Sequence, residues 1–205
     1  MRYWLFLFLF FKFGLLRAQD YTGTLYGGYY SGYGYQLSPV INVKSSTGFY
    51  GEMRYNYEDD QTFSVYAGMT FYKNFSKTSE TEFSPYLGGM FGKFEGTSPG
   101  FEIWHKTPHW DIFFQNQLPF KNRFKEGFYS NWSQLLYDTQ RNFEFGASFQ
   151  ATQPLDKKIN KEYYDFGLEL ACQIPKANLE FTFYGFNFWN NRSFFLAGIE
   201  YTVSK

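Results

Sequence analysis

The sequence predicts an all-β fold, and three observations carry that prediction. Apolar and polar residues alternate along most of the chain, which is the pattern of strands that have one apolar face and one polar face. Aromatic residues are abundant, with 28 Phe, 19 Tyr and 5 Trp among 205 residues. The mean hydropathy is nevertheless −0.44, and the chain has no apolar run of the roughly 18 residues that a membrane-spanning helix needs.

Composition and charge exclude several classes of protein. Disordered chains are poor in aromatic residues, so this chain is expected to fold. Cys172 is the single cysteine, which excludes a disulfide scaffold. The formal net charge is 0, so no overall field attracts the chain to nucleic acid, and no nucleic-acid partner is expected. The length of 205 residues suits one domain.

Residues 1–18 have the features of a cleaved secretory signal peptide. Arg2 supplies a short positive region, an apolar run follows it, and Ala18 ends the segment before a polar stretch. The alternative is an uncleaved membrane anchor, but the apolar run is too short for a span of about 20 residues, and Lys12 interrupts it. We therefore expect export, cleavage after Ala18 and a single domain over residues 19–205.

Twelve candidate strands follow the leader, and each shows the same alternation. In one of them, Phe49 and Met53 lie on the apolar face, and Glu52 and Arg54 lie on the polar face. Ten strands is the alternative, because the Gly-rich stretch over residues 26–35 also suits one strand or an irregular arm. The twelve candidates span residues 22–30, 34–44, 49–57, 62–72, 82–94, 101–106, 110–118, 127–137, 143–152, 163–173, 178–188 and 194–203.

Short turns separate the candidate strands. Gly, Pro, Ser, Asp and Asn gather in these segments, as residues that favour turns do. Two of the expected turns are residues 73–81 and residues 95–100, the second of which contains Pro99. All connections are expected to be short.

Three features favour a membrane-spanning barrel over a soluble sandwich. The candidate strands run for about 9–11 residues, whereas strands of globular proteins average about 5–6. Aromatic residues lie near strand ends, as at Tyr57, Tyr72, Trp110 and Trp189, where lipid head groups would meet them. The polar face carries Glu and Gln in mid-strand, as a wet lumen would. We expect a single antiparallel transmembrane β-barrel of about twelve strands; a secreted β-sandwich is the alternative.

With its leader segment, the chain resembles bacterial outer-membrane β-barrel proteins, in particular small porin-like barrels, over residues 20–205. Residues 194–203 are apolar at every second position and look like the terminal strand that barrel-assembly machinery reads. Residues 54–59 and 129–135 also look like segments of barrel proteins of this size. The resemblance implies the outer membrane of a Gram-negative bacterium, both termini in the periplasm, and contacts with outer-membrane lipid and barrel-assembly machinery. It brings no known activity.

The polar faces of the strands define a candidate acidic lumen. Three basic side chains, Lys44, Arg54 and Lys106, stand against eight acidic ones, which gives the lumen a formal charge of −5. Unpaired carboxylates are costly in a dry interior, so either the lumen is hydrated or several of these acids are protonated or paired. A hydrated acidic lumen favours cations over anions. This predicts a passive channel for small solutes. The acidic residues are Glu52, Glu102, Asp111, Glu144, Asp165, Glu169, Glu180 and Glu200.

Two alternatives leave the barrel without conduction. In the first, a side-chain network around Arg54 fills the lumen, and Trp132 with Gln134 either constricts or fills it. In the second, the barrel is structural or binds a surface through basic residues on its outer rim. Those rim residues are Lys121, Arg123, Lys125, Lys157 and Lys158.

No enzymatic site is expected. Some outer-membrane barrels are hydrolases with Ser–His or Asp–His sets, but no motif here links His105 or His109 to Ser130 or Ser133. Pro108 excludes the helix that would present two histidines to one metal ion. We therefore expect no catalytic residue, no metal and no cofactor, and a lipid hydrolase at these histidines is the weakest alternative.

Overall fold

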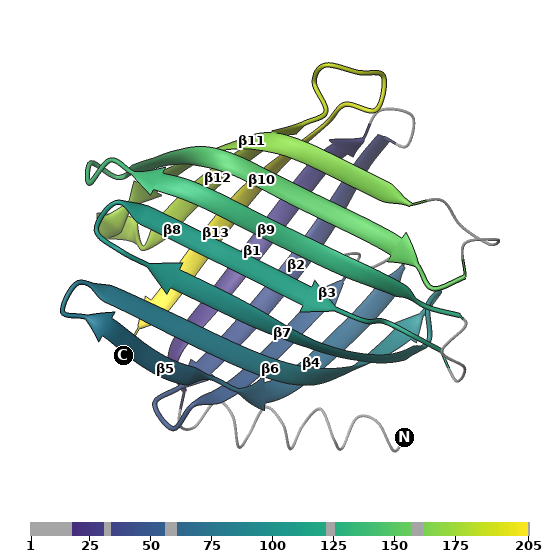
Figure 1. Ribbon diagram of the computed structural model, residues 1–205, viewed down its shortest axis with the longest axis horizontal. Helices are drawn as coiled ribbons and strands as arrows, with labels where there is room; N and C mark the ends of the chain where they lie inside the picture. Colours follow the sequence, from purple (N-terminus) through teal and green to yellow (C-terminus); the bar gives the residue numbers. More distant parts are fainter. Residues whose placement is uncertain (1–17, 31–33, 56–60, 122–125, 157–161, 205) are drawn as a thin grey trace.

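The computed structural model describes residues 18–30, 34–55, 61–121, 126–156 and 162–204. These residues form one antiparallel sheet that curls into a closed barrel (Figure 1). In this part of the chain, no helix is long and apolar enough to cross a membrane. Residues 1–17 of the predicted signal peptide lie outside the described residues, and cleavage after Ala18 stays a prediction.

The described residues form thirteen strands. The strands are β1 (Ala18–Tyr30), β2 (Gly34–Ser45), β3 (Phe49–Tyr55), β4 (Thr62–Met69), β5 (Phe71–Ser76), β6 (Ser79–Gly92), β7 (Gly96–Lys106), β8 (Trp110–Gln117), β9 (Phe128–Asp138), β10 (Phe143–Pro154), β11 (Tyr163–Ile174), β12 (Leu179–Phe186) and β13 (Phe194–Ser204). A short 3-10 turn, Pro175–Ala177, joins β11 to β12. The ring closes because β1 pairs with β13 and because β4 pairs with both β3 and β6.

β4 and β5 are two parts of one barrel strand. Both pair with β6, and Thr70 alone separates them. At this break, the Thr70 N–H donates to the Gly48 carbonyl at 2.6 Å. Gly48 has a φ of +83°, and a Cβ there would lie 2.8 Å from the Thr70 carbonyl oxygen, so the turn after β2 requires glycine. The barrel therefore has twelve strands, which confirms the prediction of twelve and makes the alternative of ten wrong.

Two predicted turns are wrong. The sequence predicts a turn over residues 73–81, but β5 and β6 occupy most of this segment and only Lys77 and Thr78 turn. The sequence also predicts a turn over residues 95–100, where β7 already begins at Gly96. Pro99 has no N–H to donate, but its backbone faces Leu118, beyond the Gly100–Gln117 pair at which the β7–β8 register ends, and its carbonyl accepts from the Leu118 N–H at 2.9 Å.

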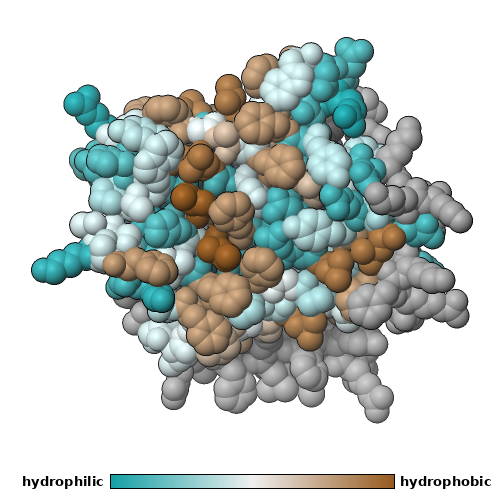
Figure 2. Space-filling view, viewed as in Figure 1, coloured by the Kyte–Doolittle hydropathy of each residue, from teal (hydrophilic) through white to brown (hydrophobic). Residues whose placement is uncertain are grey.

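The alternation places apolar side chains on the outside of the barrel. On β10 and β11, Phe145 and Leu168 are 51% and 54% exposed, whereas Glu144 and Glu169 on the inner face are 5% and 4% exposed. Figure 2 shows that most apolar side chains gather across the middle of the visible face, with strongly hydrophilic ones towards its left and right ends. An apolar outer band around a polar interior is the arrangement of transmembrane barrels.

Two groups of aromatic rings fill part of the interior. The tyrosine cluster consists of Tyr50, Tyr66 and Tyr86, from β3, β4 and β6, and the Trp132 cluster consists of Trp132, Tyr184, Phe186 and Phe194, from β9, β12 and β13. In the first, the ring centroids of Tyr66 and Tyr86 are 5.1 Å apart. In the second, Phe186 stacks on Phe194 with centroids 4.7 Å apart, and Trp132 meets Tyr184 edge-on at 5.5 Å. These rings pack the interior on two sides and leave a polar space between them and one end of the barrel.

Candidate functional site

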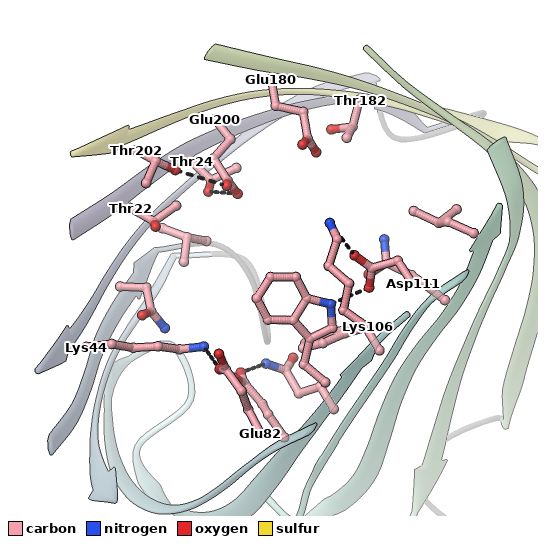
Figure 3. A pocket seen from close by; sticks show the side chains of 18 of the residues that line it. Thr22, Thr24, Lys44, Glu82, Lys106, Asp111, Glu180, Thr182, Glu200 and Thr202 are labelled. Carbon is pink, nitrogen blue, oxygen red and sulfur yellow. Dashed lines mark hydrogen bonds and ion pairs between the residues drawn. The ribbon is translucent and has the colours of Figure 1, made fainter. Parts of the chain in front are cut away.

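A cavity of about 890 Å³ lies inside the barrel. It opens towards the end at which Ala18 and Ser204 lie, on the left of Figure 1, which we call the terminal end. Its lining includes Ser45 and Asn178 beside turns of that end, and it reaches Trp132 in the middle of the barrel. Figure 3 shows charged and hydroxyl side chains from strands all around the barrel arranged about an open centre.

The charged residues of the cavity fall into two groups with different partners. The paired wall, from β2, β3, β6, β7 and β8, carries Lys44, Arg54, Lys106, Glu52, Glu80, Glu82, Glu102 and Asp111. The acidic wall, from β10 to β13, carries Glu144, Glu169, Glu180 and Glu200. All three cations of the cavity lining therefore belong to one wall.

Arg54 is the centre of the paired wall. Its side chain is 1% exposed; its Nε pairs with Glu52, and its second terminal nitrogen lies 3.5 Å from Glu102 Oε1. The Tyr50 hydroxyl lies 2.8 Å from a Glu52 oxygen and 3.0 Å from a Glu102 oxygen, so its single hydrogen is shared between these two acceptors. The Tyr66 ring lies 4.7 Å from the guanidinium carbon. A guanidinium keeps its charge in proteins, so Arg54 contacts both carboxylates and offsets one of their two charges, and this network occupies one side of the lumen.

Two lysines share the indole ring of Trp104 on the same wall. The Lys44 ammonium lies 5.5 Å from the ring centroid and pairs with Glu82. The Lys106 ammonium lies 5.7 Å from the centroid and 3.4 Å from Asp111 Oδ2. The indole N–H donates to the other oxygen of Asp111. Each lysine of this wall therefore has a carboxylate partner within the wall.

Neutral groups hold most carboxylates of the acidic wall. Gln134 donates to both oxygens of Glu169, at 2.8 and 2.9 Å, and the Ser148 hydroxyl donates to the same group. Glu180 lies directly opposite Glu200 in the β12–β13 register. Within the described ranges, Glu169, Glu180 and Glu200 form no ion pair.

Amides and hydroxyls are also the hydrogen-bond partners of Glu180 and Glu200. Gln173 bridges this wall, because its amide donates to Glu144 at 3.2 Å and to Glu180 at 3.1 Å. The Thr24 hydroxyl donates to Glu200 at 3.1 Å (Figure 3). Glu180 and Glu200 therefore have amide and hydroxyl partners rather than cations among the described residues, although they lie opposite each other.

The predicted lumen residues mostly line this cavity. Glu52, Arg54, Glu102, Asp111, Glu144, Glu169, Glu180 and Glu200 do so. Asp165 faces inward but lies nearer the opposite end of β11, outside the cavity lining, where it accepts hydrogen bonds from Gln150 and Asn187. Sequence reasoning missed Glu80 and Glu82, which also line the cavity. Glu82 is the first residue of the predicted strand over 82–94, where it alternates with Phe83, and Glu80 joins the same face once the strand is extended back to Ser79.

Trp132 and Gln134 lie side by side on the inner face of β9, and both line the cavity. Trp132 packs against Tyr184 and Phe186, whereas Gln134 is fixed by Glu169 and by the Tyr184 hydroxyl at 3.2 Å. The indole therefore fills space against β12, and the amide supports the acidic wall.

Of the predicted rim residues, the structure describes Lys121, which is not part of the cavity lining. Lys121 lies near the end opposite the terminal end, with its ammonium 5.5 Å from the Phe94 ring centroid. Arg123, Lys125, Lys157 and Lys158 lie outside the described residues. The rim hypothesis therefore stays a prediction.

The two histidines lie at the terminal end and away from the candidate serines. His105 Nδ1 lies 2.7 Å from the Thr81 hydroxyl, and His109 stacks on Tyr137 with ring centroids 5.9 Å apart. Ser130 is in register with Gln117 near the opposite end, and Ser133 donates to Asn131. In the described part of the chain, no three His, Cys, Asp or Glu residues are placed to hold a metal ion.

Comparison with solved structures places the fold. The chain is similar to a KdgM porin, at 12% identity and a TM-score of 0.62 over 88% of this chain and 98% of that one. A NanC porin gives the same identity and TM-score over 89% of this chain and 99% of that one. OccK5 (OpdH) of Pseudomonas aeruginosa is similar at 10% identity and a TM-score of 0.50, over 89% of this chain and 63% of that one.

Sequence comparison adds nothing to these structural likenesses: no protein-family model and no curated protein matches the chain. Three findings define the fold: the closed twelve-strand ring, the apolar outer face and the likeness to porin structures. The chain folds as a porin-like outer-membrane β-barrel.

Proposed function

We propose that the protein is a passive channel of the bacterial outer membrane that favours small cations. The observation that carries the proposal is the cavity of about 890 Å³, whose acidic wall has no cation of its own. The terminal end would face the periplasm, which agrees with export through the signal peptide expected over residues 1–18.

The carboxylates of the acidic wall support a hydrated lumen. An ionised carboxylate that is buried without a cation costs several kcal/mol, so a dry cavity around Glu169, Glu180 and Glu200 would be unstable. The cavity volume of about 890 Å³ leaves room for water instead. Water-filled passages lined by one sign of charge concentrate the opposite ion, so this lumen favours cations.

The packed clusters limit the size of the solute. The cavity lining reaches Arg54 on one side and Trp132 with Tyr184 on the other. A solute that crosses the barrel passes between these groups, which suits ions and small cationic molecules better than large ones.

The charge also separates this channel from one of its structural neighbours. A KdgM porin is known in complex with disordered oligogalacturonate, which is a chain of sugar acids and therefore a polyanion. The acidic wall repels polyanions. We therefore propose a different class of solute for this chain, in spite of the shared fold.

Electrical recording tests the proposal. Refolded protein in a planar bilayer should conduct, and a KCl gradient should give a reversal potential on the cation-selective side. Conductance no higher than that of protein-free bilayers would overturn the proposal, and so would anion selectivity.

The Arg54 network favours a second candidate, a barrel without conduction that serves a structural role. Its guanidinium joins β3 to Glu102 on β7 and to Gln115 and Gln117 on β8, at 3.3–3.5 Å, and so ties strands across one side of the interior. The same recording separates the two candidates. Neither candidate assigns a catalytic residue.

A further inference from the structure

The three cations of the cavity differ in how firmly they are held. The side chain of Arg54 is 1% exposed, that of Lys44 is 23% exposed and that of Lys106 is 42% exposed. Arg54 and Lys44 pair tightly with Glu52 and Glu82. Lys106 instead lies 3.4 Å from Asp111, which is loose for a charged hydrogen bond.

Lys106 also reaches beyond its own wall. Its ammonium lies 3.7 Å from Glu144 Oε1 on β10, in addition to its contact with Asp111 on β8. Among the described residues, this is the one ion pair that joins the paired wall to the acidic wall. Figure 3 shows Lys106 extended from its strand into the open part of the cavity, whereas Lys44 lies along the wall towards Glu82.

We propose that Lys106 acts as a tethered counter-ion that sets how readily mobile cations occupy the acidic wall. The inference rests on the proposed function and names a specificity-determining residue of the same lumen. When the ammonium sits at Glu144, it takes the place of a mobile cation at the terminal mouth of the cavity. When a mobile cation binds there, the ammonium retreats to Asp111.

The chemistry of the pair suits such exchange. A lysine ammonium is a compact charge on a flexible four-carbon stem, and a partly exposed ion pair adds little stability. Displacement of Lys106 by a solvated cation is therefore easy, and Asp111 keeps the displaced ammonium paired. Arg54 has no such freedom, because its guanidinium is fully enclosed by its partners.

Lys44 provides a control that is matched in charge and position. Both lysines line the same cavity, and both lie over the Trp104 ring, at 5.5 and 5.7 Å. They differ in that only Lys106 contacts the acidic wall. Lys106→Gln and Lys44→Gln therefore remove the same charge from the same cavity. A difference in ion selectivity between the two variants measures the effect of the contact between Lys106 and Glu144.

Reversal potentials across a KCl gradient test the proposal in variants that keep heat-modifiable gel migration. We expect Lys106→Gln to raise the permeability of cations relative to anions by about two- to fivefold, and Lys44→Gln to raise it by less than half as much. In a Glu144→Gln background, the effect of Lys106→Gln should shrink towards that of Lys44→Gln. Equal effects of the two lysine substitutions would overturn the proposal.

A second measurement does not depend on conduction. Trace acetylation of the wild-type barrel with acetic anhydride, read by mass spectrometry, gives the labelling of Lys106 relative to Lys44. Added MgCl2 should raise this ratio, because Mg²⁺ at Glu144 frees the Lys106 ammonium from one of its carboxylates. An unchanged labelling ratio would overturn the proposed role of Lys106 even if the barrel conducts. A raised ratio in a barrel that does not conduct would overturn only the proposed channel function.

Discussion

The two walls of the lumen both carry buried carboxylates, but these carboxylates have different partners. Glu52 and Glu102 on the paired wall are satisfied by Arg54 and Tyr50. Glu180 and Glu200 on the acidic wall are satisfied by Gln173, Thr24 and Thr202. An amide or hydroxyl meets the hydrogen-bonding need of a carboxylate and leaves its charge in place. The two walls therefore differ in whether cations or neutral groups hold their buried carboxylates, and the proposed channel assigns contact with solutes to the acidic wall.

The largest effect is expected at Arg54. Arg54→Met leaves Glu52 and Glu102 side by side without a cation, so unfolding free energy should fall by about 3–5 kcal/mol. Urea unfolding in detergent or lipid, monitored by the gel shift of the folded barrel, measures this loss of unfolding free energy. The triple variant with Glu52→Gln and Glu102→Gln should recover most of the loss. If Arg54→Met alone were as stable as wild type, the distinction between the two walls would be wrong.

Trp132 comes next, because it fills space between the acidic wall and the far half of the barrel. Trp132→Ala removes a partly buried indole that packs on Tyr184 and Phe186, so unfolding free energy should fall by about 2–3 kcal/mol. Conductance should rise at the same time, because the indole narrows the passage. Reduced stability with unchanged conductance would show that solutes do not pass this ring.

A small effect on stability is expected from the acidic wall. The double variant Glu180→Gln/Glu200→Gln keeps the hydrogen-bonding shape and removes two opposed charges. Its unfolding free energy should stay within about 1 kcal/mol of wild type or rise slightly. The same urea experiment measures it beside Arg54→Met. A loss as large as that of Arg54→Met would mean that Glu180 and Glu200 also support the fold.

The smallest effect is a dependence of selectivity on salt. The Debye length falls from about 10 Å at 0.1 M salt to about 3 Å at 1 M. The preference of the wild-type channel for cations should therefore weaken by about twofold between these concentrations. Selectivity that does not change with salt would indicate discrimination by close contact rather than by the field of the acidic wall.

Much of this comparison follows from alternation, and some of it does not. The period of two assigns Glu52 and Arg54 to one face of a single strand, because neighbouring inward positions differ by two residues. It cannot assign Glu144 as a neighbour of Lys106, since that contact depends on the register of strands that are distant in sequence. Glu80 was missed for a different reason. Residues 79–81, at the start of β6, have the composition of a turn, and only pairing with β5 and β7 makes them part of a strand.

The most direct test is the reversal potential of two charge variants across a tenfold KCl gradient. Glu180→Gln/Glu200→Gln removes two charges from the acidic wall, whereas Lys44→Gln/Glu82→Gln removes one ion pair from the paired wall and leaves the net charge unchanged. The account predicts that the first variant loses most of its preference for cations and that the second keeps it. A first variant as cation-selective as wild type, or equal losses in both, would contradict it.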